Sequence, residues 1–362
     1  MELIRKHQYT LIMDETLDIA CDFNCVASVQ RDVRQSNSKK DYAALIGNGT
    51  ITVDNDTGLV TWTGGSWVGG KFEELEKYVR QGRVYYARES TMICVYPPEM
   101  FAAFTEIYLM TYGFEASFVC PYFHRFGIAC RKASLILTDG RYELTVFSRE
   151  ADIAFRESIG GMITIRGGRG EYEKTALSKN WYAKAYENGG TELRALRNKT
   201  AYFFDEIAGA KASRDEIMWA CPKVRLPSGS ETICLENIMK GKGYTCVRRL
   251  TKEDLSLPGE DLEKLKKELS CFVPSNCRAT NMYSSRWALA YLTNLYIPPV
   301  LTGFFRDYPD ESVCAFEDAM AVSTLVQWIM RSRLRNNQPV VLYLPSARME
   351  SLLREWLGGG IL

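Results

Sequence analysis

Short apolar runs of strand length alternate along this chain with segments in which apolar residues recur every three or four positions. The strand-like runs lie at 9–15, 83–87, 92–96, 106–110, 216–220, 270–273 and 339–344. The helical spacing covers 71–80, 177–210, 257–269, 287–295, 325–335 and 346–357. Strands that alternate with helices predict an α/β fold, with a mainly parallel sheet and helices on both of its faces.

Two segments depart from this alternation. Residues 51–53 and 59–62 flank the polar turn Asp54–Gly58, which predicts a β-hairpin. Residues 134–166 alternate with a period of two, which indicates a β-rich insertion or an interdomain piece. The glycine-rich stretch 166–170 that follows indicates a flexible boundary. We therefore expect a first α/β domain with an insertion, a helical connector and a second α/β domain, over residues 1–170, 171–210 and 211–362.

The composition fits a protein of two ordinary domains, with 362 residues of which 46% are hydrophobic. The net charge of +1 gives no global attraction to polyanions, so any nucleic-acid contact has to be local. Eleven cysteines without a secretory signal or zinc-ligand spacing predict reduced thiols and a cytoplasmic protein. The longest apolar segment, 287–305, contains Asn294 and two prolines, so no membrane span is expected there.

Asp14 and Glu15 end the apolar run 9–15, and this layout can hold Mg²⁺ at the tip of a buried parallel strand. In that interpretation Asp14 binds the metal and Glu15 orients a water molecule for attack on a γ-phosphate. The alternative is a strand that ends in two solvated acids. Either interpretation fits these two residues taken alone.

Two further segments carry hydroxyl and amide groups after strands. Thr111 follows the apolar run 106–110 and either couples a metal-site carboxylate to a neighbouring domain or caps a helix that begins near Gly113. The loop 276–281 offers donors for phosphate or sugar oxygens, or forms a turn with a helix cap. Its candidate residues are Arg278, Thr280 and Asn281.

Residues 325–335 combine a glutamine with three arginines in a predicted helix. Gln327, Arg331 and Arg335 are spaced by four and would share one helix face, whereas Arg333 would point elsewhere. Planar, permanently charged guanidinium groups suit a polyphosphate or a nucleic-acid backbone, while a solvated basic face is the alternative. The apolar residues around Gln327 predict that it is partly buried.

Four of these segments, in this order, resemble the motifs of superfamily 2 helicases, and longer phrases are similar to helicase-like proteins of phages and mobile elements. The matching segments are 12–15, 109–111, 278–281 and 327–335. The resemblance implies two RecA-like lobes, of which the first is incomplete. It also implies that Asp14 and Glu15 serve Mg²⁺ and water, that Arg331 and Arg335 contact the γ-phosphate of ATP, and that Thr280 contacts the nucleic-acid strand.

The sequence departs from that family at three points. Met330 stands where the family has glycine before its first arginine, and Leu334 stands where the second arginine is usual, so Arg335 would have to substitute for it. A phosphate-binding loop ending in Gly-Lys-Thr/Ser is absent from the sequence. Thirteen residues precede Asp14, whereas a loop with its strand and helix needs roughly 30.

These observations predict a helicase-like, nucleic-acid-dependent NTPase that does not hydrolyse ATP alone in this form. Its expected partners are DNA or RNA and an upstream polypeptide that carries the phosphate-binding loop. The alternative is a non-catalytic nucleic-acid-binding or accessory protein of a mobile element, in which tryptophans act as stacking platforms or simply fill the core. Those tryptophans are Trp181, Trp219, Trp287 and Trp328. The motor interpretation requires Asp14 and the arginines to face each other across one cleft.

Overall fold

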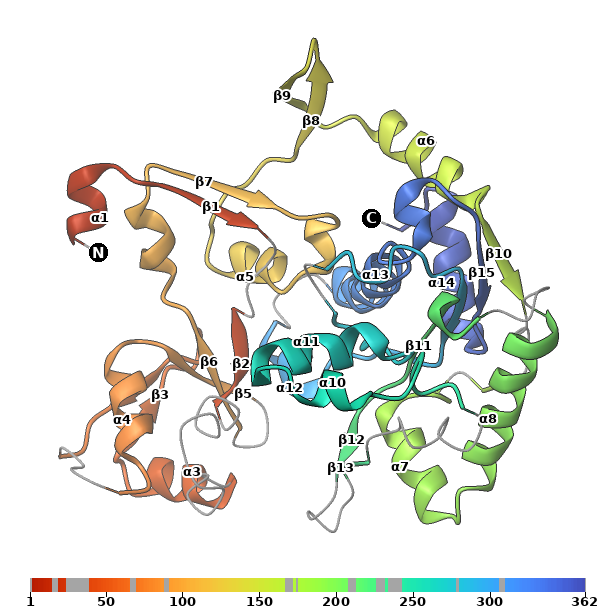
Figure 1. Cartoon of the computed structure of the whole chain (residues 1–362). Coiled ribbons are helices and arrows are strands. Elements are labelled where there is room, and N and C mark those ends of the chain that lie inside the picture. The colour runs from red at the N-terminus through yellow and green to blue at the C-terminus, as the bar shows by residue number, and fades with distance from the viewer. Residues whose placement is uncertain are drawn as a thin grey trace. The chain divides into compact units, whose positions relative to one another are not determined.

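The protein is seen in a computed structural model, shown in Figure 1. The model describes residues 2–14, 19–23, 39–65, 70–87, 91–166, 172–173, 175–207, 213–225, 232–233, 243–277, 280–305 and 310–361. The chain forms two compact units. The first unit comprises Met1–Lys132 and Ile297–Met320, and the second comprises Ala133–Tyr296 and Ala321–Leu362.

The first unit begins with α1 (Glu2–His7) and the strand β1 (Thr10–Asp14), which pairs in parallel with β7 (Glu106–Met110). Both predicted strands are confirmed and they pair in parallel, but the burial expected of β1 is wrong. Met13 is buried, whereas Ile12 is 63% exposed and Met110 is 47% exposed. The two strands form a two-stranded sheet, and such a sheet leaves one side of each strand open within the described part of the unit.

The rest of the first unit is built from antiparallel strands and short helices. The sheet β2-β6-β5 and the hairpin β3-β4 both form, and the predicted hairpin around Asp54–Gly58 is therefore confirmed. The strands are β2 (Ala20–Asp22), β3 (Ile51–Val53), β4 (Val60–Trp62), β5 (Val84–Ala87) and β6 (Thr91–Val95). The helices are α3 (Lys39–Gly47), α4 (Glu73–Arg80), α5 (Val119–Arg125), α12 (Pro299–Phe304) and the 3₁₀ helices η3 (Pro98–Ala103) and η4 (Phe114–Ala116).

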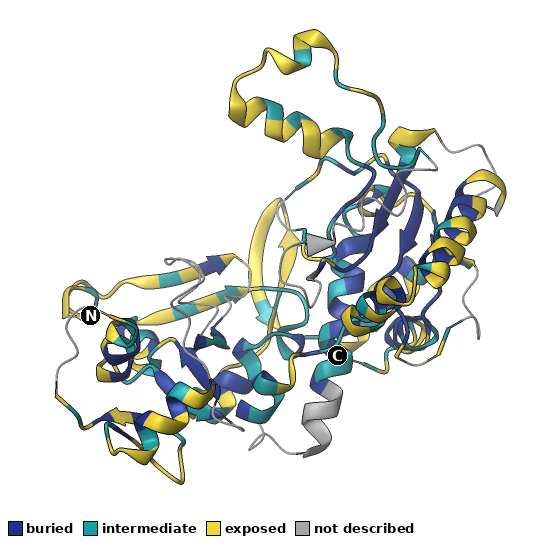
Figure 2. Cartoon of the chain, turned by 90° about the horizontal axis from the view of Figure 1, so that it is seen from below, coloured by how far each residue is buried: buried dark blue, intermediate teal, exposed yellow. Residues whose placement is uncertain are grey.

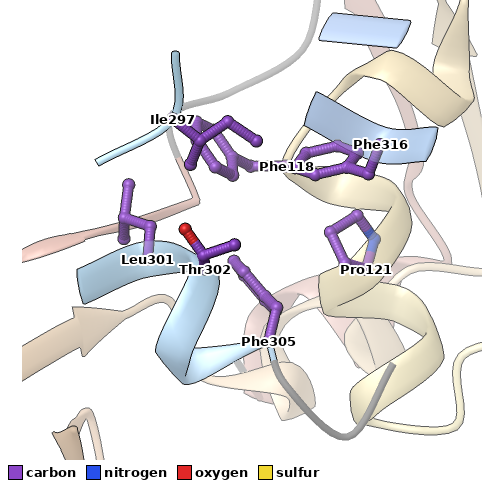
Figure 3. Close-up of a pocket in the computed structure, with 7 residues that line it drawn as sticks. All are labelled: Phe118, Pro121, Ile297, Leu301, Thr302, Phe305 and Phe316. Carbon is purple, nitrogen blue, oxygen red and sulfur yellow. The ribbon is translucent and has the colours of Figure 1, made fainter. Parts of the chain in front are cut away.

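Aromatic side chains fill the interior of the first unit. The rings of Phe118 and Phe305 stack with centroids 6.2 Å apart, and Phe304 meets Tyr85 edge to face at 5.5 Å. The rings of Phe118 and Phe305 border a small apolar pocket, shown in Figure 3. Its lining residues are Phe118, Pro121, Ile297, Leu301, Thr302, Phe305 and Phe316. A pocket with one hydroxyl among carbon-rich groups offers little to orient a polar ligand.

The second unit contains a four-stranded sheet in the order β10-β15-β14-β11, and every neighbouring pair is parallel. The strands are β10 (Ile163–Arg166), β11 (Ile217–Ala220), β14 (Ala288–Tyr291) and β15 (Val340–Tyr343). Phe272 forms a parallel bridge with Trp219, so residues 271–273 extend the sheet beyond β11. All residues of β11 and β14 are buried, and these strands are dark blue in Figure 2.

Strand β14 corrects the expected helix over 287–295. A strand buried on both faces is apolar at every position, so its sequence resembles that of a buried helix segment. Helices cover both faces of the sheet, as predicted. Tyr291 contacts Trp328 with ring centroids 5.2 Å apart, whereas Tyr343 stacks on Phe203 at 5.3 Å. Tyr343 pairs with Ala290, the residue before Tyr291, so the two tyrosines point to opposite faces.

The helices of the second unit are α6 (Arg149–Gly160), α7 (Lys179–Glu187), α8 (Thr191–Tyr202), α10 (Lys252–Leu255), α11 (Gly259–Leu269), the long α13 (Asp310–Ile329) that starts in the first unit, and α14 (Ala347–Leu357). They confirm the predicted helical segments 177–210, 257–269 and 346–357, whereas α6, α10 and most of α13 lie outside the predicted helices. A π-helical turn lies at Phe203–Ile207, with 3₁₀ turns η6 (Arg214–Glu216) and η7 (Arg333–Asn336). Two short strands, β12 (Val224–Arg225) and β13 (Thr232–Ile233), form a separate hairpin.

The segment 134–166 is not a β-rich insertion. It contains the hairpin of β8 (Ala133–Thr138) and β9 (Arg141–Val146), but α6 follows, and β10 then joins the main sheet beside β15. Arg156 of α6 is 2% exposed and donates to the carbonyl oxygens of Trp356 and Ile361 at 3.4 and 2.5 Å. The structure thus places the division between the units after Lys132, earlier than the expected boundary at residue 170.

Arg286 holds the amino ends of the sheet strands together. Its side chain is buried, and its guanidinium group donates to the carbonyl oxygens of Ile217, Glu268 and Ser270 at 2.7, 2.8 and 2.8 Å. Burial lowers the pKa of this arginine. The carbonyl oxygen of Arg286 in turn accepts from the Arg333 backbone N–H at 3.0 Å. One side chain therefore joins β11, the segment after α11 and the approach to β14.

Among the residues that the structure describes, no helix is long and apolar enough to span a membrane. The cysteines whose state is described are free thiols, and Cys94, Cys221 and Cys271 are buried.

Replacing Arg286 with leucine is expected to lower the free energy of unfolding by about 3 kcal/mol or more, because the carbonyl oxygens that it serves lose their donor while buried. Arg286→Lys should recover part of the loss, since an ammonium group cannot reproduce the planar fork. Urea unfolding measures both variants, with Arg249→Leu, at an exposed position, as the control. Equal stability of Arg286→Leu and the control would contradict this role.

Candidate nucleic-acid interface

The arginine segment, residues 327–336, is not one continuous helix. Helix α13 ends at Ile329, and a turn leads into η7. The buried Ser332 causes this break, because its hydroxyl donates to the Ile329 carbonyl oxygen at 2.6 Å and accepts from the Leu334 N–H at 3.3 Å. The predicted helix face shared by Gln327, Arg331 and Arg335 is therefore wrong.

Gln327 lies within α13 and is half-buried, as its apolar neighbours predicted. Its amide Nε2 donates to the Ser323 hydroxyl at 3.1 Å, one helical turn earlier. This glutamine therefore stabilises its own helix in the structure. The helicase resemblance also implies a catalytic role for Gln327, and that role stays a prediction.

The arginine segment meets the crossover, residues 274–287, which connects Val273 to β14. Arg335 donates from Nη1 to the carbonyl oxygen of Thr280 at 3.5 Å, and Asn336 donates from Nδ2 to the carbonyl oxygen of Ser284 at 3.3 Å. Burial raises the pKa of the Cys277 thiol, and the nearby positive charge of Arg331 opposes that rise. Two segments that the sequence singled out separately thus lie together in the second unit.

Thr280, Asn281, Arg331 and Arg335 differ in accessibility. Arg335 and Asn281 are exposed, whereas Arg331 and Thr280 are half-buried. The Thr280 hydroxyl accepts from the Met282 N–H at 3.2 Å, which is a turn interaction without a following helix. The predicted helix cap at this loop is therefore wrong. Arg278, the remaining candidate of the loop, lies outside the described residues.

The arginine segment lies at the amino ends of the strands. Arg333, which the sequence set apart, donates from Nε to the carbonyl oxygen of Pro339, just before β15, at 2.6 Å. Its guanidinium group lies 5.3 Å from the ring centroid of Trp287, just before β14. Ligands of open parallel sheets usually bind at the carboxyl ends of the strands. The segment is therefore at the opposite end of the sheet from that usual position.

The carboxyl ends carry a polar group that sequence reasoning missed. Arg348, in the first turn of α14, donates from Nη1 to Asn294 Oδ1 at 3.0 Å and to the Leu295 carbonyl oxygen at 2.8 Å. Asn294 donates from Nδ2 to the Ala176 carbonyl oxygen at 3.0 Å. Ser346 caps α14 by accepting from the Met349 N–H. The only sequence signal was a capping serine directly after a strand.

Asp14 and Thr111 are neighbours in the first unit, at the carboxyl ends of β1 and β7. Asp14 pairs with Met110, the residue before Thr111, and its side chain is exposed. The predicted helix cap by Thr111 is wrong, because η4 begins after Gly113, whose φ of 69° suits glycine, and it has no side-chain cap. Glu15 lies outside the described residues.

The fit of this strand edge to Mg²⁺ rests on a single described carboxylate. Across the described parts of both units, no group of three or more His, Cys, Asp or Glu side chains could hold a metal ion. Mg²⁺ often uses one or two carboxylates together with substrate phosphates and water. Asp14 could thus contribute one ligand, while the described residues do not form a dedicated metal cage.

The sequence-predicted residues fall into both units. Asp14 and Thr111 belong to the first unit, and the arginine segment and the crossover belong to the second. The expectation that they face each other across a cleft stays a prediction. The interpretation of tryptophans as stacking platforms is wrong for Trp219, Trp287 and Trp328, because all three are buried in the core.

Comparison with known proteins agrees with this fold. Residues 157–357 match the family described as the YonV C-terminal Rossmann-like domain, a range that starts within α6 and ends with α14. The SPbeta prophage-derived uncharacterized protein YonV of Bacillus subtilis (strain 168) is 28% identical over 367 residues, which cover 98% of this chain and 75% of that protein. No solved structure matches the chain. The chain belongs to the family of the YonV C-terminal Rossmann-like domain, and its parallel sheet is the core of that domain.

Proposed function

We propose that this chain is a helicase-like, nucleic-acid-binding protein of a phage, and that the second unit is a RecA-like lobe. The observation that carries the proposal is the contact between the Arg335 guanidinium group and the Thr280 carbonyl oxygen. It joins the crossover to the arginine segment. The helicase resemblance assigns contact with the nucleic-acid strand to the crossover and contact with the γ-phosphate of ATP to the arginine segment. The similarity to a prophage-derived protein supports the phage origin.

The chemistry of the joined segments suits a phosphate backbone. Arg335 and Asn281 present exposed donors, and Arg331 adds a half-buried positive charge beside the crossover. Arginine and asparagine side chains are frequent donors to phosphate oxygens, and such contacts hold a strand without reading its bases. A small local cluster also agrees with the net charge of +1, which gives no attraction over the whole surface.

We propose further that this chain does not turn over ATP by itself. Asp14 is exposed, and the sequence lacks the lysine and backbone cradle that bind the phosphates in P-loop proteins. Mg²⁺ would supply charge neutralisation at the phosphates if ATP bound, with Asp14 as one ligand. With ATP bound, Glu15 would orient water, and Gln327, Arg331 and Arg335 would face the γ-phosphate instead of a nucleic-acid strand. Thr111, Arg278 and Thr280 would couple the nucleotide to the strand. The phosphate-binding loop would have to come from outside these 362 residues, for example from a separate polypeptide.

The second candidate function is a non-catalytic nucleic-acid-binding or accessory protein of a mobile element. The exposure of Asp14 favours it, because a catalytic metal ligand is usually held in a water-excluded site. Both candidates use the same arginine segment. They differ in whether nucleotide changes the binding of nucleic acid.

The double variant Arg331→Ala/Arg335→Ala is expected to bind single strands at least tenfold more weakly, because two phosphate contacts are lost. Fluorescence anisotropy with labelled mixed-sequence DNA and RNA oligonucleotides measures this affinity. The magnitude of the slope of log affinity against log salt should fall by about 1.4, since each phosphate contact on a single strand contributes roughly 0.7. Arg249→Ala removes an exposed charge elsewhere in the same unit and serves as the control. Unchanged affinity and slope in the double variant would refute the interface.

Purified protein is expected to release no more phosphate from ATP than its Asp14→Ala variant, with Mg²⁺ present and with or without DNA. The reason is the missing phosphate-binding loop. A coupled assay for inorganic phosphate tests this directly. DNA-stimulated hydrolysis that disappears in Asp14→Ala would overturn the prediction and indicate a complete motor. Strand affinity that does not change with added ATP would favour the accessory function.

A further inference from the structure

The hairpin of β8 and β9 carries its apolar side chains on one face. Its register pairs Leu135 with Leu144 and Leu137 with Tyr142, and partners directly opposite each other share a face. The apolar face therefore consists of Ala133, Leu135, Leu137, Tyr142, Leu144 and Val146. The other face carries Ser134, Thr138, Arg141, Glu143 and Thr145, with Ile136 as its one large apolar residue.

This apolar face is open to solvent in the described structure. Its five larger side chains are between 54% and 84% exposed. Strands β8 and β9 pair only with each other among the described strands, and Figure 1 shows the hairpin as a separate ribbon before α6. A two-stranded hairpin is at best marginally stable in water, and a strand pair with one apolar face normally buries that face.

The turn gives the hairpin a defined shape of its own. Asp139 and Gly140 have φ values of 50° and 78°, the pattern of a two-residue turn that matches the twist of antiparallel strands. The register is therefore fixed locally, and the apolar side chains are presented together. A surface that is ordered before binding loses little conformational entropy when it is covered.

We propose that this face packs against the same face of a second copy of the chain, forming a symmetric dimer. The six side chains expose on the order of 600 Å², at the upper end for the largest apolar patch on a monomer. If two copies covered all of this area, they would bury on the order of 1,200 Å², the lower limit of specific, stable interfaces. A self-complementary patch generates a closed two-fold dimer.

The distribution of charge favours a second copy as the occupant. The apolar face has no charged residue, so two such faces can meet without burying an unpaired charge. Arg141 and Glu143 lie on the opposite face and stay in water in this arrangement. Two packed hairpins would form a small four-stranded sandwich, with the apolar side chains interdigitated between the layers. This inference does not depend on the nucleic-acid function proposed above.

Sedimentation equilibrium of the full chain tests the proposal. Wild-type protein is expected to form a dimer, and Leu135→Glu/Leu144→Glu should weaken the association at least a hundredfold, because it places charges on a directly opposed pair within the interface. The matched control, Ser134→Glu/Thr145→Glu, changes the neighbouring pair on the polar face and should leave the dimer intact. Circular dichroism checks that each variant is folded.

Hydrogen exchange of the wild-type protein gives a test without substitutions. The amides of β8 and β9 should become more protected as protein concentration rises through the range in which the dimer forms. A wild-type monomer at high concentration would overturn the proposal and leave the face to another part of the chain or to a different protein. A dimer that survives Leu135→Glu/Leu144→Glu would overturn it as well, since its interface would then lie elsewhere.

Discussion

The buried guanidinium group of Arg286 is the interaction on which the second unit depends. A parallel sheet leaves carbonyl groups at the amino ends of its strands and in the connections that reach them, and buried carbonyl groups need donors. Arg286 serves three such oxygens at once and fixes the end of the crossover. The Arg333 N–H then bonds to the Arg286 carbonyl oxygen, so the arginine segment takes its position from the same residue. The candidate interface is thus attached to the buried strands of the sheet.

Much of the fold could be predicted from periodicity, and two of the errors share one physical cause. Strands β5, β6, β11 and β15 and helices α4, α11 and α14 lie where the patterns placed them. The strand β14 was mistaken for a helix, and β1 was expected to be buried. The apolar content of a segment does not show how many strands and helices pack beside it. That number depends on pairing between segments that are distant in the sequence. A run of Ala, Leu and Tyr has the same apolar pattern in a buried strand as in a buried helix.

The candidate site was predictable as residue types and segments, but not as geometry. The sequence identified Thr280, Asn281, Arg331 and Arg335, and the structure brings the two segments of these residues together. The break at Ser332 could not be predicted from the sequence, because a serine is common on a solvated helix. Only its burial in the structure reveals the hydrogen bonds that compete with the helix. Arg286 and Arg348 were missed for a similar reason. Every residue has a backbone carbonyl oxygen. An arginine that donates to such oxygens therefore has no particular partner residue type that could be recognised in the sequence.

The path of the chain has a consequence for how the second unit can be studied. Its sheet is discontinuous in sequence, because the chain leaves after Tyr296, contributes residues 297–320 to the first unit and returns at Ala321 before β15. Strand β15 lies between β10 and β14, so the sheet cannot close until the chain has returned. The family match from 157 to 357 spans the whole excursion. A fragment cut before residue 297 would lack the central strand and the arginine segment together. Any continuous fragment that contains the whole sheet and the arginine segment therefore also contains residues 297–320 of the first unit.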